Sequence, residues 1–199
     1  MRPQMQRNGL TIRAFSSTLA RHSRFLLPPF PFVDVTRATY WCVLGGAALW
    51  CLLLAAAPLL AAAGQPLSVL GDALYRFFDP ICHQIEIRSL AIAGHPLAVC
   101  SRCSAIYIAF LAGAAVFPLV RSLRTSAGLS RGWIAAAVTP MVLDAVLGAI
   151  GVHEPGFATR LVTGGIFGFA AVFVVLPPGL QAVREIALQR KSRRETSTA

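Results

Sequence analysis

Charged residues are scarce in this sequence. Asp, Glu, Lys and Arg make up 13% of the 199 residues, about half of the ~25% that is usual for soluble domains. No charged residue occurs between Ala38 and Gly71, and 56% of all residues are hydrophobic. This composition excludes an ordinary soluble domain and predicts a membrane protein.

Acidic residues and lysine are especially few. Eight acidic residues stand against eighteen basic ones, of which Lys191 is the one lysine, and the net charge is +10. A nucleic-acid-binding protein needs its basic residues on one face or stripe, whereas here they lie at the chain ends and in one short connector. We therefore expect no nucleic-acid partner and interpret the basic segments as cytoplasmic flanks of membrane-spanning helices.

The number of cysteines is odd. Of the five, Cys42 and Cys51 lie inside an apolar run, which argues against a small scaffold held by disulfides. The other three, Cys82, Cys100 and Cys103, fall within 22 residues. His83 follows the first of them directly. This is the one stretch in which chemically versatile side chains are concentrated.

Four apolar segments are long enough to cross a bilayer, which takes roughly 20 residues. They give spans at about 40–62, 97–120, 132–152 and 159–180, within a membrane domain at 39–183. Basic tails at 1–38 and 184–199 flank this domain. The fold class predicted is an all-α membrane protein with four transmembrane helices.

A short amphipathic helix is predicted before the second span, over residues 68–81. Leu70, Leu74 and Phe77 recur at helical spacing, while Asp72 and Arg76 fall on the other face. This pattern is typical of a helix that lies in the membrane interface.

The distribution of Lys and Arg predicts the orientation. With four spans, the two tails and the 121–131 loop share one side and hold fourteen basic residues, against four on the other side. Both termini are therefore expected in the cytoplasm of a multi-pass cell-membrane protein, with the cysteine cluster at the outer face. The first 38 residues also resemble a transit peptide, being rich in Arg and poor in acids, but we interpret them as a cytoplasmic tail.

Several polar side chains are expected at the level of this cluster. On a helix, Cys100, Cys103 and Tyr107 share one stripe. Asp144 lies inside the third span, where an acid is a functional hypothesis by default. Arg160 opens the fourth span, after a hinge with His153 and Glu154. Behind Arg160, the spacing of Gly164 and Gly168 allows another helix to approach closely.

The leading hypothesis is a metal-binding membrane protein, with metal transport or handling as its role. Three thiols and an imidazole suit Zn²⁺ or another transition metal. Cys82, Cys100 and Cys103 are the expected ligands. His83 is either a fourth ligand or an orienting group, because adjacent residues rarely bind one ion together.

Three alternatives stay open. Outside the cytoplasm a Cys-x-x-Cys pair can form a structural disulfide. It can also act in thiol–disulfide exchange, since Arg102 and a helix N-terminus would depress a thiol pKa. In that enzyme Cys100 and Cys103 would be the active pair, Cys82 would resolve it and a quinone would accept the electrons. Finally, the chain can be a structural or assembly subunit, with Asp144 and Arg160 as an ion pair that holds helices together.

Four spaced motifs resemble those of a known family. They are Cys82-His83-Gln84-x-x-x-Arg88-Ser89, Cys100-x-Arg102-Cys103-x-x-Ile106-Tyr107, Pro140-x-x-x-Asp144 and Arg160-x-x-Thr163-Gly164. Together they resemble the predicted membrane proteins called domain of unknown function 2085, over about 70–180. The resemblance implies that Arg88, Arg102, Tyr107, Asp144 and Arg160 belong to the site, but it implies no activity.

The sequence departs from the family pattern at several positions. Glu86-Ile87 replaces the usual Pro-Glu, and Phe157 replaces an Asn. Alanine stands where glycine is usual at Ala105, Ala109 and Ala145. We therefore expect the site to be kept while helix packing differs. If the protein transports an ion, four helices would have to form a homo-oligomer to enclose the path.

Overall fold

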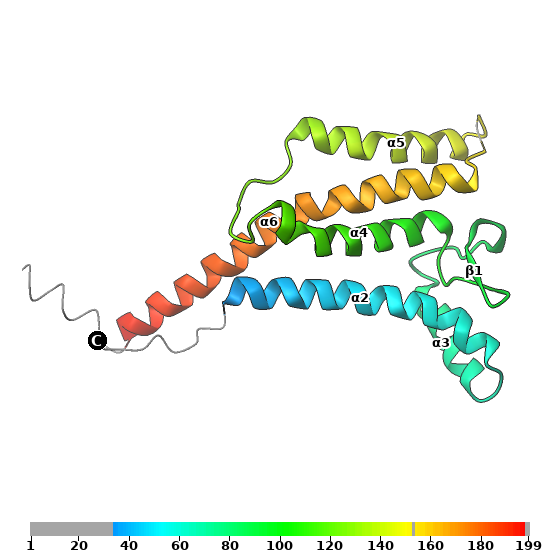
Figure 1. The fold of residues 1–199 in the computed structure, drawn as a ribbon, viewed down its shortest axis with the longest axis horizontal. Coiled ribbons are helices and arrows are strands. Elements are labelled where there is room, and N and C mark those ends of the chain that lie inside the picture. Colours follow the sequence, from blue (N-terminus) through cyan, green and yellow to red (C-terminus); the bar gives the residue numbers. More distant parts are fainter. Residues whose placement is uncertain (1–33, 153, 198–199) are drawn as a thin grey trace, which may run out of the picture. The chain divides into compact units, whose positions relative to one another are not determined.

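The computed structural model describes residues 34–152 and 154–197, and helices dominate it (Figure 1). The elements in chain order are α2 (Val35–Ala62), α3 (Leu67–Phe78), the 3₁₀ helix η1 (Glu86–Arg88), β1 (Ala91–Ile92), β2 (His95–Pro96), α4 (Ser101–Val120), α5 (Arg131–Ala149) and α6 (Phe157–Ser197). Of these, α2, α4, α5 and α6 are long and apolar enough to cross a membrane. The predicted fold class is confirmed, while most of the predicted N-terminal tail lies outside the described residues.

Two helices, α2 and α6, extend beyond the hydrophobic segments that were predicted for them. Helix α2 begins at Val35, because the Asp34 carboxylate caps it by accepting a hydrogen bond from the Thr36 backbone N–H at 3.2 Å. Helix α6 passes Pro177 and Pro178 and continues to Ser197. Its last part is rich in strong helix formers such as Leu, Gln, Arg and Glu. The C-terminal segment that was predicted as a tail is therefore helical as far as Ser197.

The helices lie side by side in the order α2, α4, α6, α5, and α6 packs most extensively against α4 (Figure 1). Gly164 and Gly168 make this close packing possible. A Cβ on Gly164 would lie 2.6 Å from the Arg102 carbonyl oxygen, and one on Gly168 would lie 2.2 Å from that of Ile106. The contact moves from Arg102 to Ile106 on α4 as it moves from Gly164 to Gly168 on α6. The two helices therefore run parallel. The glycine spacing thus marks a helix contact, as expected.

A tyrosine on α2 compensates for a proline in α4. Pro118 has no N–H, so the carbonyl oxygen of Ala114, four residues earlier, has no partner within the helix. The buried Tyr40 hydroxyl donates a hydrogen bond to this oxygen at 3.0 Å. In a membrane such a carbonyl has no water to bond. The contact therefore joins α2 to α4 and satisfies a polar group that α4 itself leaves free.

Helix α3 lies where the amphipathic helix was expected. It packs against α2 through Gly71, where a Cβ would lie 2.8 Å from the Ala61 backbone nitrogen. Leu70 and Phe77 remain more than half exposed. The location of α3 in the membrane interface stays a prediction.

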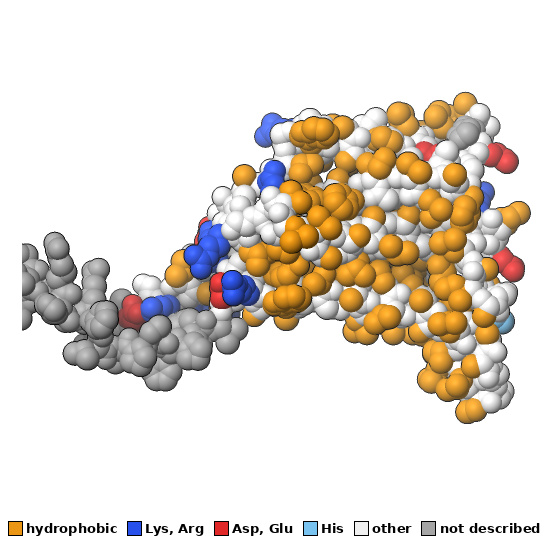
Figure 2. Space-filling view, viewed as in Figure 1, with side chains coloured by type: hydrophobic (Ala, Val, Ile, Leu, Met, Phe, Trp, Pro, Cys, Tyr) orange, Lys and Arg blue, Asp and Glu red, His pale blue; other side chains and the backbone are white. Residues whose placement is uncertain are grey.

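Hydrophobic side chains cover the visible face of the helices (Figure 2). Lys and Arg side chains gather toward the later part of α6 and the start of α5. The opposite end of the helices carries α3, the short hairpin and the starts of α4 and α6 (Figure 1). This end holds the predicted site.

Candidate metal centre

Cys82 is held by the turn that ends α3. Its backbone N–H and that of Ile81 both donate to the carbonyl oxygen of Phe78, at 3.1 and 3.0 Å. Phe78 is fully buried, which fixes this turn against α2 and α4. Gln84 then adopts a left-handed backbone with φ 49, and its side-chain amide donates to the Tyr75 carbonyl oxygen at 2.6 Å. Cys82 is consequently buried, at 7% exposure.

A short hairpin directs the chain back toward Cys82. Strands β1 and β2 pair around Ala93 and Gly94, whose φ angles are 52 and 81, as the two central residues of a tight hairpin turn require. The buried residues Leu97, Ala98 and Val99 follow. They bring Cys100 to the N-cap position of α4, with Cys103 one turn further along.

The three thiols meet. The sulfur atoms of Cys82, Cys100 and Cys103 lie within 4.8 Å of one another, and all three cysteines are free. The Cys100 backbone N–H donates a hydrogen bond to the Cys82 sulfur at 3.2 Å. Hydrogen bonds from the Cys103 side chain outweigh burial and lower the pKa of Cys100 to about 5. The arrangement therefore favours thiolate at the mouth of α4.

Three sulfurs at this separation could hold a metal ion. Zn–S bonds of about 2.3 Å place two sulfurs of a tetrahedral site about 3.8 Å apart. The observed 4.8 Å limit exceeds this by about 1 Å, so small side-chain rotations close the site around an ion. A disulfide would use two of the three thiols and leave one over. The donor set, three soft thiolates, suits Zn²⁺ and related ions.

Asp144 forms an ion pair with Arg102 of α4, and not with Arg160, the partner considered from the sequence alone. Its carboxylate is 8% exposed. The backbone of Arg102 lies against Gly164 of α6. Arg160 lies one turn earlier, level with the segment around Cys100, and its Nε donates to the Pro155 carbonyl oxygen at 3.0 Å. An Asp144–Arg160 ion pair is therefore not formed.

The other expected residues divide into two groups. Arg88, Arg102, Cys100 and Asp144 all act electrostatically on Arg160, so the structure brings these polar groups together. His83, by contrast, is exposed and does not belong to the group of three thiols, and Glu154 is exposed as well. His153 lies outside the described residues.

The comparisons with known proteins cover this same region. The family model described as "Predicted membrane protein" (DUF2085) matches residues 82–174. An uncharacterised protein of Methanocaldococcus jannaschii is 38% identical over 104 residues, which are 52% of this chain and 67% of the relative. The chain belongs to the DUF2085 family. The matched range begins at Cys82 and includes the thiols, Asp144 and Arg160. No solved structure matches the chain, so the DUF2085 comparison adds no experimental fold.

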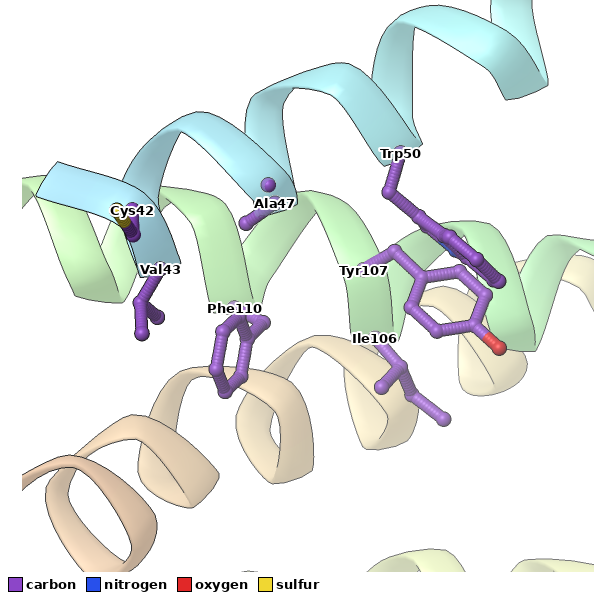
Figure 3. A pocket seen from close by; sticks show the side chains of 8 residues that line it. Cys42, Val43, Ala47, Trp50, Ile106, Tyr107 and Phe110 are labelled. Carbon is purple, nitrogen blue, oxygen red and sulfur yellow. The ribbon is translucent and has the colours of Figure 1, made fainter. Parts of the chain in front are cut away.

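An aromatic pocket next to the thiols was not expected from the sequence. Trp50 of α2 packs edge-on against Tyr107 of α4, with ring centroids 5.7 Å apart, and both residues pack on the cluster that includes Cys82 and Cys103. They line a cavity of about 400 Å³ between α2 and α4 (Figure 3). The remaining lining is apolar and includes Phe110. A tryptophan in the middle of the first span was the available signal, but helix packing alone decides which neighbours it contacts.

Proposed function

We propose that this DUF2085 protein binds a divalent transition-metal ion, with Zn²⁺ the best fit, through Cys82, Cys100 and Cys103. The observation that carries the proposal is the convergence of three free thiols within 4.8 Å. They come from two segments of the chain, the turn after α3 and the start of α4, so the fold rather than a local motif completes the set.

The surroundings of the sulfurs support metal binding. The backbone N–H that donates to Cys82 and the N-terminal end of α4 both stabilise negative sulfur. A metal site needs deprotonated thiols, and the lowered pKa of Cys100 favours one of them. Tyr107 and Trp50 pack against the buried cluster that includes Cys82.

Three protein ligands leave one position of a tetrahedral ion open. Sites of this kind typically exchange a ligand, whereas structural zinc sites are closed by four. Water is the proposed occupant of this position, and His83, which lies outside the group of three thiols, is the proposed orienting group. The charge distribution of the loops supports an outer-face location. Handling or transfer of a metal ion at this face is therefore the proposed role.

Elemental analysis of detergent-purified protein tests the proposal. We expect about one metal ion per chain, lost in Cys100→Ser and kept in Cys42→Ser. Cys42 is a matched control because it is an exposed, free cysteine on α2. A wild-type protein without stoichiometric metal, or equal loss in both variants, would overturn the proposal.

A second candidate function is thiol–disulfide exchange. Cys100 and Cys103 are hydrogen-bonded through their side chains, and Cys82 is close enough to act as a resolving thiol. The adjacent aromatic pocket of about 400 Å³ can accommodate the ring of a membrane quinone. In this function an exported dithiol would reduce the Cys100–Cys103 disulfide and be oxidised to a disulfide itself. The two electrons and two protons would then pass from the Cys100–Cys103 dithiol to the quinone, yielding the quinol.

Thiol labelling separates the two functions. A membrane-impermeant maleimide should count the same number of reactive thiols in oxidising and reducing buffers if the cluster holds a metal. An oxidoreductase should lose two reactive thiols in the oxidising buffer. If Cys82→Ser and Asp144→Asn change only the amount of protein, with neither metal nor redox response in the wild type, the structural or assembly role is favoured instead.

A further inference from the structure

Arg160 is a buried cation whose hydrogen-bonding capacity is largely unused. Its side chain is 9% exposed, yet within the described residues it makes one hydrogen bond, from Nε to the Pro155 carbonyl oxygen. A guanidinium group carries five N–H donors, so four of them have no acceptor among the described residues. A buried charge left in this condition is costly, especially in a protein that spans a membrane.

A second arginine beside it is also incompletely satisfied. Arg102 forms an ion pair with Asp144, but its Nε is buried and has no hydrogen-bond partner. The backbone of Arg102 touches α6 at Gly164, one turn from Arg160. The two arginines therefore both lie at the contact between α4 and α6, and Arg102 acts electrostatically on Arg160.

The charges around Arg160 do not balance. Its strongest electrostatic neighbours are Arg88 and Arg102, ahead of Cys100 and Asp144. Three guanidinium groups thus face one carboxylate and the cysteine cluster. If Zn²⁺ and three thiolates occupy that cluster, their net charge is −1, and the set as a whole stays positive.

We propose that Arg160, Arg102 and Arg88 form a binding site for a phosphate-type oxyanion beside the metal centre. Guanidinium groups match phosphate and carboxylate oxygens in a bidentate manner. A phosphate group suits this site better than a carboxylate, because it offers three acceptor oxygens and about −1.5 to −2 of charge at neutral pH. Arg160 and Arg102 supply the buried donors, and Arg88, which is exposed, lies at the rim.

The phosphate group can belong to a free anion or to a phospholipid headgroup, and two assays separate these sources. The first measures binding of radiolabelled inorganic phosphate to the full chain in phosphatidylcholine nanodiscs. The second compares thermal stability in nanodiscs with and without phosphatidic acid. Chloride at matched ionic strength controls for screening. Stabilisation in the second assay alone assigns the lipid headgroup, and saturable binding in the first assigns the free anion.

Three variants test the residues. We expect Arg160→Gln to weaken binding more than about tenfold and Arg88→Ala about threefold. Arg76→Ala should leave binding unchanged, because Arg76 is an exposed arginine of α3 that is not among the neighbours of Arg160. If Arg160→Gln does not fold, the comparison of Arg88→Ala with Arg76→Ala tests the proposal. No saturable binding in either assay, an equal effect of chloride, or equal weakening by Arg76→Ala would overturn the proposal. Because Cys100→Ser retains all three arginines, phosphate binding can succeed where metal binding fails.

Discussion

The contact between α4 and α6 permits a sharp test, because two glycines of α6 that are three residues apart have different surroundings. At Gly168 an added Cβ would lie 2.2 Å from the Ile106 carbonyl oxygen and 2.8 Å from its Cα. At Gly165 nothing lies within 4 Å of the added atom. Gly168→Ala and Gly165→Ala therefore introduce the same methyl group into the same helix, once inside the contact and once outside it.

The two substitutions should change stability in opposite directions. Ordinary contact begins at 3.4 Å, so the Gly168→Ala methyl group forces α4 and α6 apart by about 1 Å. Overpacking of this kind costs about 1–3 kcal/mol, which exceeds the roughly 0.5–1 kcal/mol that alanine gains over glycine inside a helix. Gly165→Ala gains helix stability in the same way, but it causes no overpacking because nothing lies within 4 Å of the added methyl group. Its free energy of unfolding should rise or stay the same, while that of Gly168→Ala should fall.

Unfolding by denaturing detergent, followed by circular dichroism, measures both variants against the wild type. The displacement should also reach the candidate site, because Arg102 lies one turn from Ile106. We therefore expect lower metal occupancy in Gly168→Ala, with Gly165→Ala unchanged. A Gly168→Ala protein at least as stable as Gly165→Ala would refute the close approach of the two helices.

Three further predictions concern buried polar groups and the metal. Asp144→Asn removes the partner of a largely buried Arg102 and should lower the free energy of unfolding by about 3–5 kcal/mol; adding Arg102→Gln should recover part of the loss in a double-mutant cycle. Tyr40→Phe leaves the Ala114 carbonyl oxygen without its donor and should cost about 1–3 kcal/mol in the same unfolding assay. A phenylalanine variant with unchanged stability would show that this carbonyl needs no partner. Finally, a chelator should lower the melting temperature of the wild type, since a bound ion at 1,000 times its dissociation constant adds about 4 kcal/mol. Cys103→Ser should melt at one temperature with or without the chelator.

Much of the architecture follows from local properties of the sequence. Long uncharged segments determine the membrane helices, because a backbone in lipid must bond within its own helix. Helix ends were less predictable. Asp34 extends α2 by capping it, and α6 continues through Pro177 and Pro178, where hydropathy indicates only that the apolar segment ends.

In the candidate site, too, some features follow from the local sequence and others depend on contacts between distant segments. Three closely spaced cysteines in one connector mark the place, whereas the hairpin between Cys82 and Cys100 became visible only in the structure. Pairing across helices is different, because it depends on the register of one helix against another. Asp144 could have met either arginine, and in the folded chain it pairs with Arg102.

By itself, the sequence determined that this is a four-helix membrane protein with three thiols in one connector. Hydrophobicity and residue spacing are properties of short stretches of the chain, so they can be read without the fold. Only the tertiary structure decided that Cys82 joins Cys100 and Cys103, that Arg102 pairs with Asp144, and that Arg160 is buried with one hydrogen bond among the described residues. These outcomes depend on how closely two helix surfaces approach. That distance is set by side chains from segments far apart in the chain.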